Sequence, residues 1–113
     1  MMNEDKKGII LQCVEGMVLL DHSKIIMIES FKHNCMIHLE NETYHNYDGI
    51  GSLEERLKSY GFVRIHRSYL VNIRHIRKIS NYVITLDTGT KLPVSRARYR
   101  AVKAAFSEII SLH

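Results

Sequence analysis

The sequence predicts a mostly β domain with two short helices, and three observations carry that prediction. Short apolar or alternating segments recur along the chain between turn signals such as Glu15-Gly16, Glu40-Asn41-Glu42 and Asp87-Thr88-Gly89-Thr90. Helical periodicity occurs only near the middle and at the end of the chain. The 113 residues contain one proline and no internal repeat or linker. We therefore expect residues 1–8 to be a flexible N-terminus and residues 9–113 to form a single domain.

The first half of the chain is expected to form strands followed by one short helix. Apolar runs predict strands over residues 9–14, 17–21, 24–31, 35–39 and 43–47. Ser52 is followed three residues later by Glu55, the spacing of a capping box, and Leu53 and Leu57 share a helical face. The pattern predicts a helix from Leu53 to Ser59, stopped by Gly61.

The second half predicts more strands and a C-terminal helix. Phe62–His66 alternates between apolar and polar residues, which is typical of a half-buried strand, whereas Ser68–Asn72 suggests a compact turn or one helical turn. Strands are expected over residues 73–80, 82–86 and 91–94. Ser95 is a natural N-cap for the last helix. The apolar stripe of that helix consists of Tyr99, Val102, Phe106 and Ile109.

Composition excludes several classes of protein. Hydrophobic residues make up 45% of the chain and charged residues 25%, as in ordinary soluble domains. No apolar run approaches the ~18 residues that cross a membrane, and the charged N-terminus does not resemble a signal peptide. Cys13 and Cys35 lie in apolar stretches, which favours buried free thiols in a reducing, cytoplasmic location.

The positive charge is concentrated in the second half. Residues 1–60 contain six Lys and Arg against ten acids, whereas residues 61–113 contain ten against two, so the two parts carry −4 and +8. Most of the ten are arginine, whose planar side chain suits phosphates and guanine edges. This half of the chain therefore predicts a polyanionic partner.

An ordered, spaced motif runs through Phe62–Asn72, His75-Ile76 and Gly89–Arg96. It resembles the LytTR DNA-binding domain found in bacterial response regulators, and the Ile28-Glu29 pair and the Leu53-to-Tyr60 helix also lie where the family has them. The resemblance covers about residues 8–110. It implies an elongated stack of small, mainly antiparallel sheets that reads double-stranded DNA with loops, which enter successive major grooves, rather than with a recognition helix.

The resemblance implies that three segments contact DNA. The first is the turn Lys32-His33-Asn34, and the second is His66-Arg67-Ser68, in which His66 is equally suited to a core position. The third is the entry to the last helix, where N–H groups and the helix dipole favour a phosphate. It contributes Ser95, Arg96, Arg98 and Arg100, with the choice between Arg96 and Arg98 as base reader left open.

Metal binding, enzymatic activity and RNA binding are less well supported by the sequence. His33-x-Cys35-x-x-His38 has metal-ligand residue types, but a strand would turn Cys35 and His38 to opposite faces. No nucleophile elbow or phosphate loop supports an enzyme. Tyr69, Tyr82 and Tyr99 could stack RNA bases, but no RNP-type strand pair accompanies them, so we interpret them as core residues with a solvated hydroxyl. No metal or cofactor is expected.

The sequence therefore predicts a sequence-specific, double-stranded DNA-binding domain that regulates transcription in bacteria. The alternative is a non-enzymatic module that binds an acidic protein or a membrane surface through the basic half. The resemblance implies direct-repeat promoter sites, and the absence of heptads predicts a monomer that pairs only on DNA. No receiver domain is recognisable before residue 9, so the sequence is that of either a stand-alone regulator or the effector half of a response regulator, and a receiver domain or regulatory partner is expected outside it.

Overall fold

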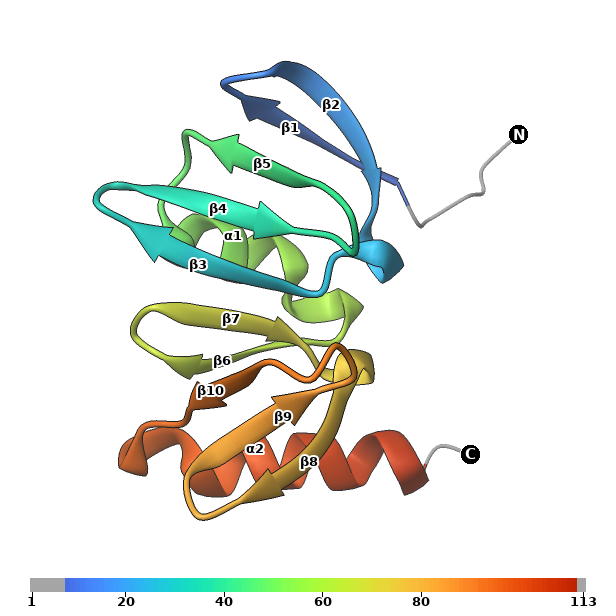
Figure 1. The fold of residues 1–113 in the computed structure, drawn as a ribbon, viewed down its shortest axis with the longest axis vertical. Helices are drawn as coiled ribbons and strands as arrows, with labels where there is room; N and C mark the ends of the chain where they lie inside the picture. Colours follow the sequence, from blue (N-terminus) through green and yellow to red (C-terminus); the bar gives the residue numbers. More distant parts are fainter. Residues whose placement is uncertain (1–7, 112–113) are drawn as a thin grey trace.

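The computed structural model describes residues 8–111, which form ten strands and two α-helices (Figure 1). The strands are β1 (Gly8–Cys13), β2 (Gly16–Asp21), β3 (Met27–Phe31), β4 (Asn34–His38), β5 (Thr43–Asn46), β6 (Phe62–His66), β7 (Tyr69–Asn72), β8 (Ile76–Ser80), β9 (Val83–Leu86) and β10 (Lys91–Pro93); the helices are α1 (Ile50–Leu57) and α2 (Arg96–Ser111). Short 3₁₀ turns cover His22–Lys24, Lys58–Tyr60 and Ile73–His75. Of the expected flexible N-terminus, residues 1–7 lie outside the described residues, and Gly8 begins β1.

All strand pairs are antiparallel, and the expected mostly β class with two helices is confirmed. Seven strands form one sheet in the order β2-β1-β5-β4-β3-β7-β6, which is larger than the small sheets expected. The other three form a sheet in the order β10-β9-β8. The molecule measures 38 × 36 × 24 Å. It is a flattened body in which α2 lies along the end opposite to β1 and β2 (Figure 1).

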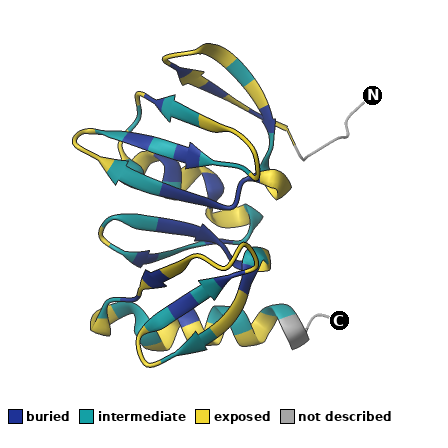
Figure 2. Cartoon of the chain, in the orientation of Figure 1, coloured by how far each residue is buried: buried dark blue, intermediate teal, exposed yellow. Residues whose placement is uncertain are grey.

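The alternation of side chains in β3 and β7 divides the interior into two cores. Ile28 pairs with Leu70, and both belong to the core beneath α1. Met27 pairs with Val71 one position away, and both belong to the core that α2 shares with the three-stranded sheet. Successive side chains of a strand point to opposite faces, so two central strands supply both cores. Figure 2 shows the buried segments in these strands and the exposed residues at the turns.

Two predicted boundaries in the first half were wrong. Helix α1 begins at Ile50 with Gly49 as its N-cap, so Ser52 lies inside the helix and does not cap it. The predicted strand over residues 24–31 is shorter than expected, because a 3₁₀ turn covers His22–Lys24 and the strand begins only at Met27. Asp21 accepts from the Ser23 N–H and so caps that turn, a local hydrogen bond that competes with strand formation.

In the second half, the predicted turn at Ser68–Asn72 is instead strand β7 from Tyr69 onward. It pairs with β6 through the turn Arg67-Ser68 and with β3 some 40 residues earlier, and the second, distant pairing leaves no local signal in the sequence. The strand predicted to start at Ile73 begins at Ile76, after a 3₁₀ turn capped by the Asn72 side chain. The apolar stripe of α2 is confirmed, with Val102 buried and its other members packed against the same core.

The first hairpin turn is Val14-Glu15, one residue earlier than predicted, because Cys13 pairs with Gly16. Within residues 8–111, no helix is long and apolar enough to cross a membrane.

Candidate nucleic-acid interface

The strand directions bring two of the three predicted DNA-contacting segments to the same end of the large sheet. Strand β7 runs antiparallel to both β3 and β6, so β3 and β6 finish at one end of the sheet. The turn after β3 (Lys32-His33) and the turn after β6 (Arg67-Ser68) therefore lie side by side, and the Ser30 N–H donates to the Ser68 carbonyl over 2.8 Å. Both turns are on the left of Figure 1.

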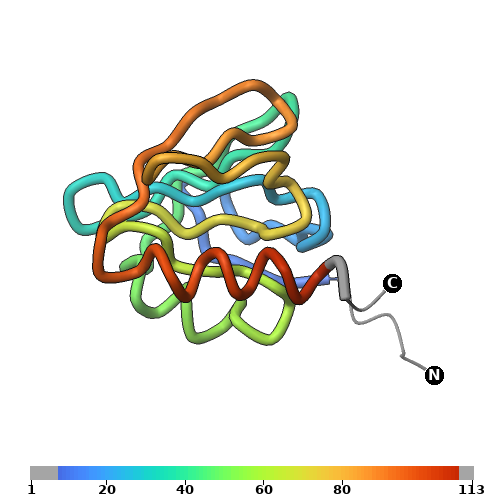
Figure 3. Tube along the Cα trace, turned by 90° about the horizontal axis from the view of Figure 1, so that it is seen from below, coloured from blue at the N-terminus to red at the C-terminus, as the bar shows by residue number. Residues whose placement is uncertain are grey.

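The start of α2 lies at the same end. The Ser95 N–H donates to the carbonyl of Ile65 in β6 over 2.9 Å, and this bond fixes the residue just before α2 beside the end of that strand. Figure 3, seen from below, also places the start of α2 and the β3–β4 turn on one side. We call these three segments (Lys32-His33, Arg67-Ser68 and Ser95-Arg96) the loop end.

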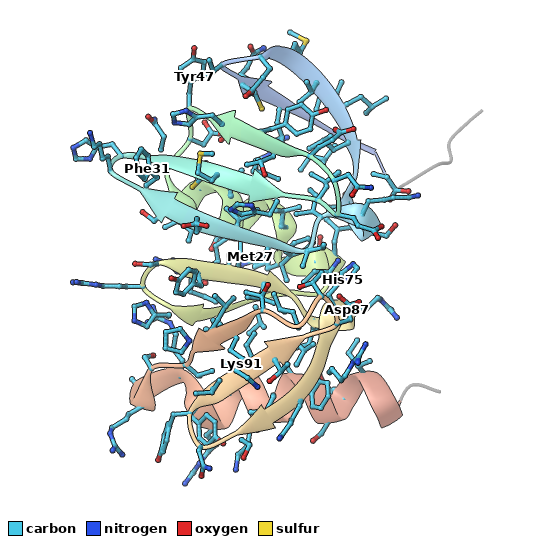
Figure 4. The ribbon with its side chains drawn as sticks, viewed as in Figure 1. Met27, Phe31, Tyr47, His75, Asp87 and Lys91 are labelled. Atoms are coloured by element: carbon cyan, nitrogen blue, oxygen red, sulfur yellow. The ribbon has the colours of Figure 1, made fainter. Side chains whose placement is uncertain are left out.

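In the β3–β4 turn, two residues are exposed and one is engaged. Lys32 has a φ of 59°, and its ammonium lies 5.7 Å from the centre of the Phe31 ring. His33 beside it is exposed. The Asn34 side-chain N–H donates to the Tyr47 carbonyl over 3.0 Å, which leaves its carbonyl oxygen and second N–H open. Figure 4 shows Phe31 and Tyr47 on this side of the molecule.

The β6–β7 turn presents one cation that has no partner within the described part of the chain. The Arg67 side chain is exposed and makes no hydrogen bond or ion pair there. The Ser68 N–H donates to His66 Nδ1 over 3.1 Å, and the His66 ring lies 5.5 Å from that of Tyr69. His66 is half-buried, and its ring nitrogen accepts the hydrogen bond that closes the turn, a local role in addition to the core position and the DNA contact expected from the sequence.

Arg64 supports this turn from behind, a role that sequence reasoning missed. Its Nε donates to the carbonyl of His66 over 2.9 Å, and its second terminal nitrogen donates to the carbonyl of Arg67 over 2.6 Å. The remaining nitrogen contacts Glu54 Oε1 of α1 at 2.8 Å, and the Arg64 side chain is only 15% exposed. One rigid guanidinium thus holds two backbone carbonyls and a carboxylate. The sequence feature that could have indicated this role is the position of Arg64 within an alternating strand, but net charge alone does not separate such an arginine from an exposed one.

At the start of α2, the four predicted residues differ in accessibility. The Ser95 hydroxyl is buried and has no hydrogen-bond partner in the described structure, so the predicted side-chain cap does not form; the Ser95 carbonyl accepts from the Arg98 N–H over 3.1 Å. Arg96 and Arg100 are exposed, and their i, i+4 spacing places them on one face of the helix. Arg98 is partly buried on another face.

Several other cations are not at the loop end. Arg74 belongs to the 3₁₀ turn after β7, and because β7 starts at the loop end it delivers Arg74 to the opposite end. There His75 Nδ1 contacts Asp87 Oδ2 at 2.8 Å, and both residues appear on the right of Figure 4. The Arg77 guanidinium donates to the Asp87 carbonyl over 3.4 Å. The charge of the basic half is therefore divided between two ends.

The cysteines are not exposed for chemistry. Cys35 is fully buried in the core beneath α1, and this burial raises the pKa of its thiol to about 11. His38, three positions along β4, pairs instead with Glu29 at 2.7 Å on the other face. Cys35 and His38 thus face apart, as the strand alternation predicts.

Comparison with known proteins gives a consistent family. The family model described as the LytTr DNA-binding domain matches residues 15–107. Sensory transduction protein LytT of Bacillus cereus is 32% identical over 94 residues, which cover 79% of this chain and 38% of that protein. Transcriptional regulatory protein LytR of Staphylococcus aureus is 32% identical over 92 residues, covering 77% and 37% respectively. The chain therefore spans well under half the length of these regulators.

A solved structure supports the same fold. The LytTr DNA-binding domain of a response regulator from Bacillus cereus superimposes with a TM-score of 0.75 at 24% identity, over 89% of this chain and 97% of that one. The family model covers most of the chain, and the two regulators are similar over more than three-quarters of it. The chain belongs to the LytTR DNA-binding domain family.

Proposed function

We propose that this chain binds double-stranded DNA sequence-specifically through its loop end and regulates transcription in the bacterial cytoplasm. The family is one of DNA-binding domains, and the chain is not an enzyme. The observation that carries this proposal is the exposed Arg67 guanidinium, which has no hydrogen-bond or ion-pair partner among residues 8–111 and extends from a turn whose carbonyls accept from Arg64. A fixed turn bearing such an arginine suits readout of a guanine edge.

The order of the three segments supports insertion into successive major grooves. They follow one another along the long axis of Figure 1, which at 38 Å spans the whole described molecule, β1 and β2 included. The repeat of B-DNA is about 34 Å. We propose that the β3–β4 turn and the start of α2 enter successive major grooves, and that Arg67 reaches a base edge from the turn between them.

The proposed contacts are those expected from the sequence, with their roles refined by position. Lys32, His33, Arg67 and Arg96 are exposed at the loop end and are assigned to direct contact. Asn34, His66, Ser68, Ser95, Arg98 and Arg100 surround them, some of them engaged in the turns as described. We propose that the domain, residues 9–113, is a monomer in solution that pairs on direct repeats, with any receiver domain or regulatory partner lying outside these residues.

The experiment begins with selection of duplexes from a random-sequence library by the wild-type chain. Affinities are then measured for the selected duplex and for a scrambled duplex of the same composition. Arg67→Ala is expected to weaken binding to the selected duplex by about tenfold to a hundredfold, equivalent to ~1–3 kcal/mol, with little change on the scrambled one. Arg74→Ala, at the opposite end, is the matched control and should change neither.

Three outcomes would contradict the proposal. Failure to enrich any duplex would overturn sequence-specific binding and would favour the alternative, a module for an acidic protein or membrane surface. Equal losses for Arg67→Ala on both duplexes would make Arg67 a phosphate contact. A stable dimer of free protein in sedimentation at micromolar concentration would contradict pairing only on DNA.

A further inference from the structure

The β8–β9 turn has an unfavourable residue in a restricted conformation. Ser80 pairs with Val83, so Asn81-Tyr82 is a two-residue turn, and φ is 53° at Asn81 and 63° at Tyr82. Turns with two left-handed residues favour Asn followed by Gly, because a side chain is disfavoured there. Asn81 fits this preference and Tyr82 does not. A residue held in such a conformation invites a search for what its side chain contacts.

The Tyr82 ring lies in a stack that reaches the loop end. Its centre is 4.2 Å from that of the Tyr99 ring, and the Arg96 guanidinium lies 4.7 Å from it. On Tyr99, the Lys103 ammonium is 4.9 Å from the ring centre. Tyr82 remains 39% exposed, so it is not the core residue expected from the sequence. Within residues 8–111, Arg96 makes no hydrogen bond or ion pair, so this ring is its principal contact.

We propose that Tyr82 is a positioning residue that holds the Arg96 guanidinium for DNA readout, so that Arg96 and not Arg98 is the base-reading arginine of α2. This inference rests on the proposed DNA-binding function. An arginine restrained before binding loses less conformational entropy on binding than a free one. Arg98, in contrast, is partly buried and has no ring contact of this kind among the described residues.

The decisive variant is Tyr82→Gly, because it removes the ring and leaves the residue pair that this turn favours. We expect the domain to stay folded, with an unfolding midpoint within a few degrees of wild type. Affinity for the library-selected duplex should fall about threefold to tenfold, the scale of a cation–π contact together with restored side-chain freedom. Affinity for the scrambled duplex should change less. Tyr82→Phe keeps the ring and should restore wild-type preference.

A double-mutant cycle shows whether Tyr82 acts through Arg96. In an Arg96→Gln background, adding Tyr82→Gly should cause no further loss of affinity, whereas in an Arg98→Gln background the full loss should remain. Equal, additive losses in both backgrounds would overturn the proposal. So would unchanged preference in Tyr82→Gly alone while the wild type still selects a duplex.

A measurement on free protein does not depend on the behaviour of any variant. Nitrogen-15 relaxation of the arginine Nε groups in the wild type should show Arg96 more ordered than Arg100, its neighbour one turn along the same face. Equal mobility would refute restraint by Tyr82. Failure of the wild type to select any duplex would instead overturn the proposed function and leave this result intact, so the two failures are distinguishable.

Discussion

Replacing Arg64 is expected to disable DNA recognition although Arg64 does not face DNA. Arg64 is three residues before Arg67 and carries the same charge, but its guanidinium is occupied by Glu54 and by the carbonyls of the β6–β7 turn. Arg64→Met keeps the length of the side chain and removes all three polar contacts. Arg64→Lys keeps the charge near Glu54 but cannot bridge two carbonyls in a fixed plane.

The magnitude follows from how far water can replace each contact. A hydrogen bond to a charged group contributes about 1.5–3 kcal/mol. Glu54 is 37% exposed and the Arg67 carbonyl is near the surface, so solvation recovers part of each loss. We expect Arg64→Met to lower the free energy of unfolding by about 2–3 kcal/mol, and the midpoint by roughly 6–15 °C in a domain of this size. Arg64→Lys should lose about half as much.

The assay compares unfolding and DNA binding for Arg64→Met and Arg67→Ala at a temperature at which both are folded. Arg64→Met should lose both stability and duplex preference, because the turn that carries Arg67 is no longer held. Arg67→Ala should lose preference but keep its unfolding free energy within about 0.5 kcal/mol, as expected for an exposed side chain. If Arg64→Met unfolds like wild type and loses affinity equally on all duplexes, Arg64 is a phosphate contact and the reasoning is refuted.

Three further predictions concern a buried asparagine, the salt dependence of DNA binding and a buried thiol. Asn72→Ala should lower the free energy of unfolding by about 1–3 kcal/mol, because this 1%-exposed side chain bonds the Ile25 carbonyl and the Arg74 N–H. It should leave the DNA affinity of the folded protein unchanged, because Asn72 lies at the end of β7 opposite to the loop end. A selective loss of preference at one base pair would contradict this. The plot of log affinity against log salt concentration should have a slope of about −4 to −5, because five cations lie at or near the loop end: Lys32, Arg67, Arg96, Arg98 and Arg100. A slope of −2 or shallower would exclude that number of phosphate contacts. Burial raises the pKa of the Cys35 thiol from 9.0 to about 11, so the folded state favours the neutral thiol. Stability should therefore decline as pH rises from about 9 to about 11. If Cys35→Ala shows the same decline over that range, Cys35 is not its cause.

For the buried Asn72, the type of interaction can be predicted from the sequence, but its partners cannot. The sequence places Asn72 after three residues with apolar bodies, a position that predicts hydrogen bonds to the backbone of the turn bearing Arg67 and Ser68 and not contact with DNA. Its side chain does bond backbone, but to Ile25 and Arg74 and not to the turn that carries Arg67. The partner Ile25 is 47 residues away, so only the folded chain brings the two together.

The sequence by itself determined the features that depend on local chemistry. Alternating and apolar segments specify the mostly β class, the helical stripe specifies the buried face of α2, and the ordered motif around Phe62–Asn72 identifies the family. The charge asymmetry also needs no structure. These properties are readable because strand and helix periodicities and motif spacing involve neighbours in the chain.

The tertiary structure alone decided which cations can act together. Three arginines lie within eleven residues of the chain but differ in their surroundings. Arg64 is hydrogen-bonded behind the β6–β7 turn, Arg67 is exposed on that turn, and Arg74 lies at the opposite end of β7. It also decided that Tyr82 lies against Arg96 and not in the core. The physical reason is that strand pairing between distant segments sets the direction of each strand, and strand direction sets the end of the sheet at which each turn emerges.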